Sequence, residues 1–156
     1  MARVRIERSK QLAGKLRALR TATQGPVRAA LADVAGDIVG MAKRQVPDGP
    51  GKGALDLGET IKWHFGAAEG GGSDAKTGRS AATTVTITAG DKNNPEAGWV
   101  EFGTPPRINA GIYAGTQHPG TPPQPFFFPA YRANKKAGAR KINKAIRDAV
   151  KWVAAK

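Results

Sequence analysis

Apolar residues recur at helical spacing in the stretch that follows Pro26. The apolar positions are separated by four, three, four and three residues, and they are Val27, Leu31, Val34, Ile38 and Met41. This spacing predicts an amphipathic helix over residues 26–46, with the proline in its first turn. The helix is expected to end before Pro47, because the residue that precedes a proline avoids helical backbone angles.

A second helical pattern lies near the C-terminus. Its apolar stripe consists of Ile142, Ala145, Ile146, Ala149, Val150 and Val153. Basic side chains occupy most of the remaining positions, so we expect a helix over residues 130–154 with one apolar face and a basic back.

Strict alternation marks the middle of the chain. Ile61, Trp63 and Phe65 alternate with polar residues, and threonines alternate with apolar residues over residues 83–89. Both patterns predict half-buried antiparallel strands. Residues 99–102 form a short apolar segment that ends at Gly103, and we interpret it as a third strand.

Upstream of Pro26 the pattern is weaker. Val4 and Ile6 alternate with charged residues, which indicates a short strand, and Ser9 is placed to cap a brief helix that carries Leu12, Leu16 and Leu19. Gly25 and Pro26 are expected to break the chain between this segment and the next helix.

Four segments are expected to be loops. Residues 48–53, 66–80 and 91–95 are rich in glycine, proline and polar residues. Residues 103–125 contain six prolines and four glycines, so they form neither a helix interior nor a central strand. The glycine-rich stretch and the long proline-rich loop are interpreted as contact arms.

Together these elements predict a single α+β domain over residues 1–156, in which two main helices pack on a small antiparallel β-sheet. The length of 156 residues and an apolar fraction of 40% are sufficient for one modest core. The expected core consists of Leu31, Val34, Ile38, Trp63, Val85, Ile87, Phe102, Ile142 and Ile146.

The net charge of +13 is concentrated at the two ends. Residues 1–25 contain seven basic side chains against one acid, residues 132–156 contain nine against one, and the middle is nearly neutral. Such segregation indicates an anionic partner, either nucleic acid or an acidic protein surface, although solvated helix faces have the same composition. No apolar run approaches a membrane span, and the charged N-terminus does not resemble a signal peptide, so we expect a cytoplasmic protein.

Candidate catalytic chemistry is sparse. The absence of cysteine excludes disulfides and thiolate chemistry, and the histidines, His64 and His118, lack metal-binding spacing. No serine lies in a nucleophile elbow, and residues 49–54 lack the spacing of a phosphate-binding loop. We therefore expect no enzyme activity, no metal and no cofactor.

Two aromatic motifs flank the long loop: VEFGTPP over residues 100–106, and PQPFFFPAY over residues 123–131. With Ala42, Lys43 and Pro47 at the end of the first helix, and Gly53, Leu55 and Ile61 after it, their order resembles the gp-ten-like tail-component family of long-tailed bacteriophages. The similarity spans residues 6–150. The glycine-rich stretch, the long loop and the strongly basic ends are departures from the family pattern.

The resemblance implies a structural virion protein of the phage neck, assembled in the bacterial cytoplasm. It would form a homo-oligomeric ring, a hexamer, that terminates or completes the tail and joins it to the head by binding the tail tube and the neck connector or stopper. The family motif and expected subunit contact comprise Glu101, Phe102, Gly103, Thr104, Pro125, Phe126, Phe127 and Pro129.

The chemistry of the motif residues also suggests a structural role, independently of the resemblance. An extended backbone would bury Val100 and Phe102 and direct Glu101 towards a partner or the cap of a nearby helix. The two prolines would hold the three phenylalanines in an extended segment before the helix, with Phe127 facing opposite to its neighbours. These rings serve either the core or a subunit contact.

A non-specific nucleic-acid-binding protein remains the alternative. It requires only the charge distribution, and no helix-turn-helix or zinc finger is visible. The residues expected to contact DNA or an acidic partner are Arg3, Arg5, Arg8, Arg140, Lys141, Lys144 and Arg147.

Overall fold

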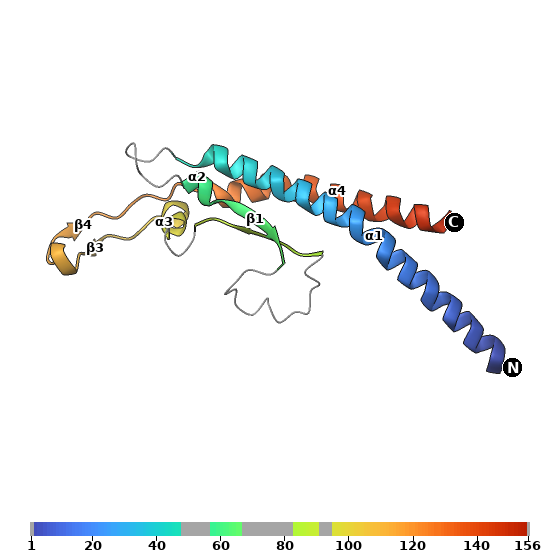
Figure 1. Cartoon of the computed structure of the whole chain (residues 1–156). Helices are drawn as coiled ribbons and strands as arrows, with labels where there is room; N and C mark the ends of the chain where they lie inside the picture. The colour runs from blue at the N-terminus through green and yellow to red at the C-terminus, as the bar shows by residue number, and fades with distance from the viewer. Residues whose placement is uncertain (1, 48–56, 67–82, 91–94, 156) are drawn as a thin grey trace. The chain divides into compact units, whose positions relative to one another are not determined.

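The structure, a computed structural model, describes residues 2–47, 57–66, 83–90 and 95–155, and the side chains from residue 9 onward. Helices account for most of these residues (Figure 1). The long elements are α1 (Ala2–Gln45) and α4 (Phe127–Ala154). The short helical elements are α2 (Leu57–Thr60), α3 (Glu96–Phe102) and the 3-10 helix η3 (Gly111–Tyr113).

The described strands form two small sheets. One pairs β1 (Lys62–Phe65) with β2 (Val85–Thr88), and the other pairs β3 (Arg107–Ile108) with β4 (Gln117–His118). The expected α+β architecture is therefore wrong: the described part is mainly helical. Strands of two to four residues present too little surface to support two long helices, which pack on each other instead.

The chain divides into two compact units. Unit 1 comprises Met1–Val34, Phe65–Val85 and Lys135–Lys156, and unit 2 comprises Ala35–His64 and Thr86–Asn134. In unit 1, α1 and α4 approach closely at Val34 and Gly138. A Cβ atom built on Gly138 would lie 2.6 Å from a methyl group of Val34. In unit 2, the Asn134 amide lies 3.4 Å from the Met41 sulfur.

Helix α1 overturns two expectations about the N-terminus. Residues 4–6 are helical rather than a strand, and the helix continues through Pro26 instead of breaking there. Proline removes one backbone donor, but Leu19, Val27 and Leu31 are partly buried on both sides of it. Burial of a continuous apolar face therefore outweighs the local cost of one proline.

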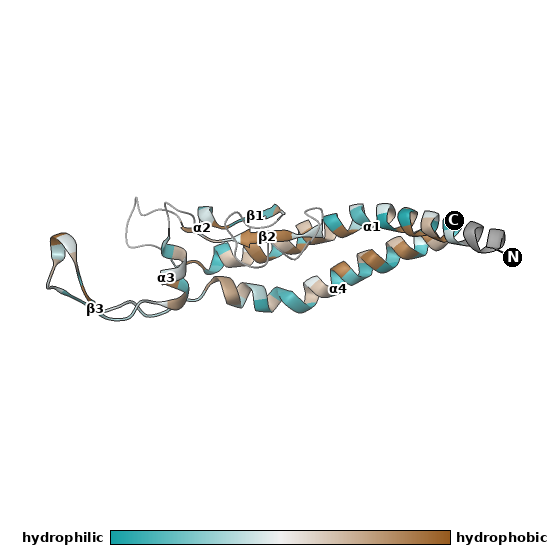
Figure 2. Cartoon of the chain, turned by 90° about the horizontal axis from the view of Figure 1, so that it is seen from below, coloured by the Kyte–Doolittle hydropathy of each residue, from teal (hydrophilic) through white to brown (hydrophobic). Residues whose placement is uncertain are grey.

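Helix α4 begins at Phe127, three residues before the expected start, and ends at Ala154 as expected. The phenylalanine segment is therefore largely the first turn of a helix and not an extended approach to it. Apolar bands along α4 alternate with polar ones in Figure 2, as the stripe of apolar residues predicts.

Helix α3 replaces the third expected strand. Ala97 and Glu101 are buried and are four residues apart, which is one helical turn. Phe102, expected in the core, is 69% exposed. The predicted third strand is therefore wrong, because an apolar segment of four residues is too short to distinguish a strand from a helix.

The core of unit 2 is formed by small side chains together with two large ones, Ile61 and Phe126, which are almost fully buried. They cluster with Ala42, Leu57, Ala97 and Ala130. Of the expected core residues only Ile38 is fully buried, while Phe102 and Ile146 are exposed and the other six are partly buried. The expectation failed because it placed the core under a sheet, whereas helices converge on alanines that allow close approach.

Strands β1 and β2 confirm two of the three predicted strands, within the bounds given above. In unit 1, the Arg28 guanidinium lies 3.8 Å from the centre of the Phe65 ring, which is a cation–π contact. The loop expected over residues 48–53 lies outside the described residues, as does most of the glycine-rich stretch and of the turn at residues 91–95.

Candidate functional site

Glu101 is the buried charged residue of the described chain, with only 6% of its surface exposed. It occupies the last turn of α3, where the helical spacing from Ala97 turns it inward. A carboxylate is costly to bury unless hydrogen bonds replace the water it loses.

The start of α4 supplies those hydrogen bonds. Glu101 Oε2 accepts the backbone N–H groups of Phe126 and Phe127, both at 2.8 Å, and Oε1 accepts that of Phe128 at 3.0 Å. The fourth position is Pro129, which has no N–H. Because a helix leaves its first four N–H groups without internal partners, this arrangement satisfies the whole N-terminus of α4.

These bonds confirm the expectation that Glu101 caps a nearby helix, although Glu101 itself lies on a helix rather than an extended strand. The two motifs are thereby joined directly, and Gln124 adds a backbone bond to the Val100 carbonyl at 2.8 Å. The negative carboxylate also lies at the positive end of the α4 dipole, which stabilises both groups.

Between the two motifs the chain forms an arm, defined as residues 103–125. At its base, Thr104 and Thr121 exchange two backbone hydrogen bonds at 3.0 Å. Gly103 and Gly120 have φ values of +71° and +83°, and a Cβ on either would lie 2.5 Å from the opposite threonine carbonyl oxygen. The two segments therefore cross so closely that only glycine fits at these positions.

Beyond the crossing the arm is held together by its own hydrogen bonds. Strands β3 and β4 are antiparallel, with Arg107 opposite His118. Asn109 bonds to Thr116 through both its backbone N–H, at 2.9 Å, and its side-chain amide, at 3.0 Å. Three large apolar side chains of the arm are exposed: Ile108 at 71%, Ile112 at 98% and Tyr113 at 70%.

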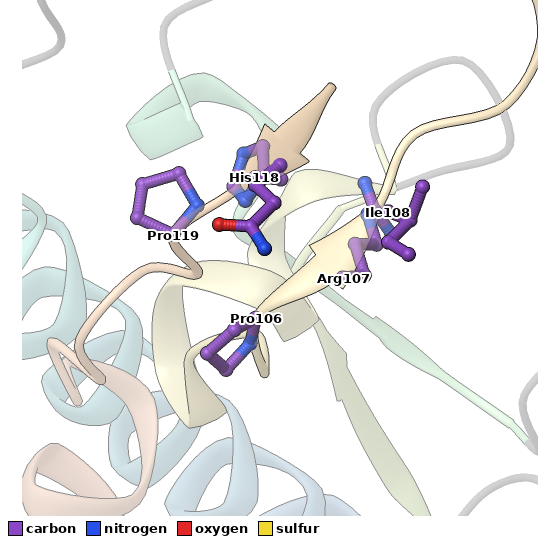
Figure 3. Close-up of a pocket in the computed structure, with 6 residues that line it drawn as sticks. Pro106, Arg107, Ile108, His118 and Pro119 are labelled. Atoms are coloured by element: carbon purple, nitrogen blue, oxygen red, sulfur yellow. The ribbon is translucent and has the colours of Figure 1, made fainter. Parts of the chain in front are cut away.

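One face of the arm is hollowed. The hollow has a volume of about 380 Å³ and is lined by Pro106, Arg107, Ile108, Gln117, His118 and Pro119 (Figure 3). His118 is oriented by its own backbone, because its Nδ1 accepts the N–H of Gly120 at 3.0 Å. We call this feature the arm hollow.

Aromatic side chains gather beside the arm base. The Phe102 and Phe128 rings lie 5.9 Å apart at a tilted angle, and Phe128 makes an edge-on contact with Phe127 at 5.9 Å. Trp99, Phe102 and Phe128 are 50%, 69% and 41% exposed. We call these three residues the aromatic patch. Trp99 lies three residues before Phe102 on α3, on the same side of the helix. Exposed aromatic side chains that gather in this way are typical of interaction sites.

The predicted motif residues are thus brought together, but their roles differ. Phe102 is the most exposed ring of the motif; of the three consecutive phenylalanines, Phe126 is in the core, Phe127 packs against it, and Phe128 is exposed. Pro125 is exposed. The sequence did not identify Trp99, Arg107 or Ile112 as site residues. The available signal was the proline-rich composition that predicted a loop over residues 103–125.

Unit 1 contains both basic ends of the chain. Among its described side chains twelve are basic and two, Asp33 and Asp148, are acidic, and all twelve basic residues are exposed. They include Arg140, Lys141, Lys144 and Arg147 on α4. Arg3, Arg5 and Arg8 lie on α1, but their side chains are outside the described part.

Within the described ranges, no cluster of three or more histidine and acidic side chains is arranged to hold a metal ion. The described helices include none that is both long and apolar enough to cross a membrane. Comparison with models of known protein families, with characterised proteins and with solved structures finds no match.

Proposed function

We propose that this chain is a structural, non-enzymatic protein of the bacteriophage neck, which assembles into a ring that terminates or completes the tail and joins it to the head. The observation that carries the proposal is the triple hydrogen bond from Glu101 to the start of α4. It links the two motifs on which the family resemblance depends, and it fixes the arm between them.

The shape of the arm supports an assembly function. The hydrogen bonds of the arm beyond its base are made within the arm, and its large apolar side chains are exposed in the single chain. In a ring of copies related by rotation, each copy presents one surface to the next and covers its exposed apolar groups. The tail tube and the neck connector or stopper would then contact opposite faces of that ring.

The location of the protein on assembled particles tests this function. Gold-labelled antibody against the purified chain should decorate purified virions at the head–tail junction in electron micrographs. Antibody absorbed beforehand with the same protein is the control and should leave the particles bare. Virions that contain no label at the junction, with the protein recovered elsewhere, would contradict the proposal.

Nucleic-acid binding is the second candidate, and the concentration of basic side chains on unit 1 favours it. Paired helices with twelve exposed basic residues and two acids attract phosphate without reading sequence. In a ring, the same residues would contact DNA that passes through the channel.

Salt dependence separates phosphate binding from other binding. Fluorescence anisotropy with a short labelled duplex should show affinity that falls linearly with salt on logarithmic axes, with a slope of about 0.9 per phosphate contacted. Replacement of Arg140, Lys144 and Arg147 by glutamine should reduce that slope. As a control, glutamine at Lys43 and Arg44 of unit 2 should leave it nearly unchanged.

A further inference from the structure

Unit 2 carries two exposed surfaces with complementary chemistry. On α3, Glu96 and Trp99 are three residues apart and share a face of the helix, so an acid borders the aromatic patch. The lining of the arm hollow includes two prolines, Ile108 and the cationic residue Arg107. Such a lining suits an aromatic ring, which packs against proline and receives a cation on its face.

The charges are complementary as well. Helix α3 contains two acids and no base, and Glu101 is already committed to α4. The arm contains Arg107 and no acid. Neither Glu96 nor Arg107 has an ion pair among the described residues. An Arg107–Glu96 pair would therefore fix the register in which the two surfaces meet.

A single chain does not bring these surfaces together. The arm is stiffened by its paired strands and by the crossing at Gly103 and Gly120. Within unit 2 it extends away from α3, as Figure 1 shows. A contact between the arm hollow of one copy and α3 of another uses two different surfaces, so each copy retains one free surface for the next. Contacts of this kind form a ring when the rotation between neighbouring copies closes, as the proposed function requires.

We propose that the arm hollow of one copy binds Trp99 of a second copy, with Arg107 of the first paired to Glu96 of the second. This contact specifies how the proposed ring is built and rests on that function. Both sides of the contact, the arm hollow and the α3 face with Trp99 and Glu96, belong to unit 2.

Charge reversal tests the pairing. Arg107→Glu and Glu96→Arg each place like charges at the contact, and each should weaken self-association of the purified protein about tenfold in sedimentation velocity. The double variant exchanges the two charges and should restore association. Lys136→Glu makes the same charge change on unit 1, outside both surfaces, and should leave association unchanged.

Cross-linking tests the proximity. The chain has no cysteine, so a single introduced cysteine is the only thiol that the cross-linker can react with. Gly98→Cys lies beside Trp99 with open space around its Cβ, and Gln117→Cys lines the arm hollow. A short bismaleimide should join the two variants when they are mixed, and it should give little dimer with either variant alone.

Three results would overturn the contact: a protein that stays monomeric up to its solubility limit, a double charge variant that fails to recover, or a mixture of Gly98→Cys and Gln117→Cys that yields no cross-linked product. Each result concerns the purified protein alone. Antibody labelling of virions measures location independently, so the contact can fail while the neck function holds.

Discussion

The carboxylate of Glu101 accepts the backbone N–H of Phe126 at 2.8 Å, although 25 residues separate them in the chain. With the bonds to Phe127 and Phe128, this contact ties the end of α3 to the beginning of α4. Glu101 therefore helps to hold both the base of the arm and the start of the helix next to the buried Phe126.

Replacement of Glu101 by glutamine should lower the free energy of unfolding by about 1–3 kcal/mol, because an amide offers one acceptor oxygen and turns its NH₂ towards a buried backbone donor. Denaturant unfolding of the purified protein measures the change. Glu59→Gln is the matched control: the Glu59 side chain is 77% exposed, and its ion pair within the described residues is with Lys43, so the loss there should stay below about 1 kcal/mol. Equal losses at both positions would contradict the capping role.

Phe126 and Phe128 are expected to separate folding from assembly. Phe126→Ala removes a fully buried ring and should cost about 3–5 kcal/mol of folding free energy. Phe128→Ala removes a ring that is 41% exposed and should cost about 0.5–1.5 kcal/mol, mainly the contacts with Phe102 and Phe127. Phe128→Ala should instead weaken self-association, as measured by sedimentation. Intact association of this variant would remove Phe128 from the interaction surface.

Gly138→Ala should destabilise the protein although alanine is the better helix former. Its Cβ would lie 2.6 Å from a methyl of Val34, whose branched side chain cannot turn away easily. The clash should cost about 1–3 kcal/mol. Gly36→Ala, also inside a helix but with open space at the Cβ, should stabilise by about 0.5–1 kcal/mol. Thermal unfolding of the two variants should therefore shift in opposite directions.

Gly120→Ala should open the base of the arm. Gly120 has a φ of +83°, which residues with a side chain rarely adopt, and its added Cβ would lie only 2.5 Å from the Thr104 carbonyl oxygen. Hydrogen exchange at the amides of Thr104 and Thr121 should then accelerate. Gly111→Ala has a similar φ of +71° but free space, so the same amides should keep their protection. Unchanged exchange in Gly120→Ala would mean that the crossing tolerates a side chain.

Pro26→Ala tests the continuity of α1. In a helix interior, proline is about 3 kcal/mol less favourable than alanine, so the substitution should stabilise the protein substantially. A helix that broke at Pro26 would gain little. Pro122→Ala in the arm should have the opposite sign and cost about 0.4–1 kcal/mol, because it frees the unfolded chain. Denaturant unfolding with helical circular dichroism detects both effects.

The sequence by itself determined the local features whose cause is local. Apolar spacing predicted α4 and the second half of α1, and alternation with threonine predicted β1 and β2. Prolines and glycines marked the arm, because their backbone limits do not depend on distant contacts. Segregation of charge was likewise visible in the residue order alone.

Only the tertiary structure decided how these elements are used. Helix α1 continues through Pro26, because burial of a long apolar face outweighs one lost hydrogen bond. Residues 96–102 form a helix, because this conformation buries Ala97 and Glu101 together. The tertiary structure also placed both basic ends on unit 1 and exposed Phe128 rather than Phe127. These outcomes depend on contacts between residues far apart in the chain, and the linear pattern of a sequence does not contain the distances that decide them.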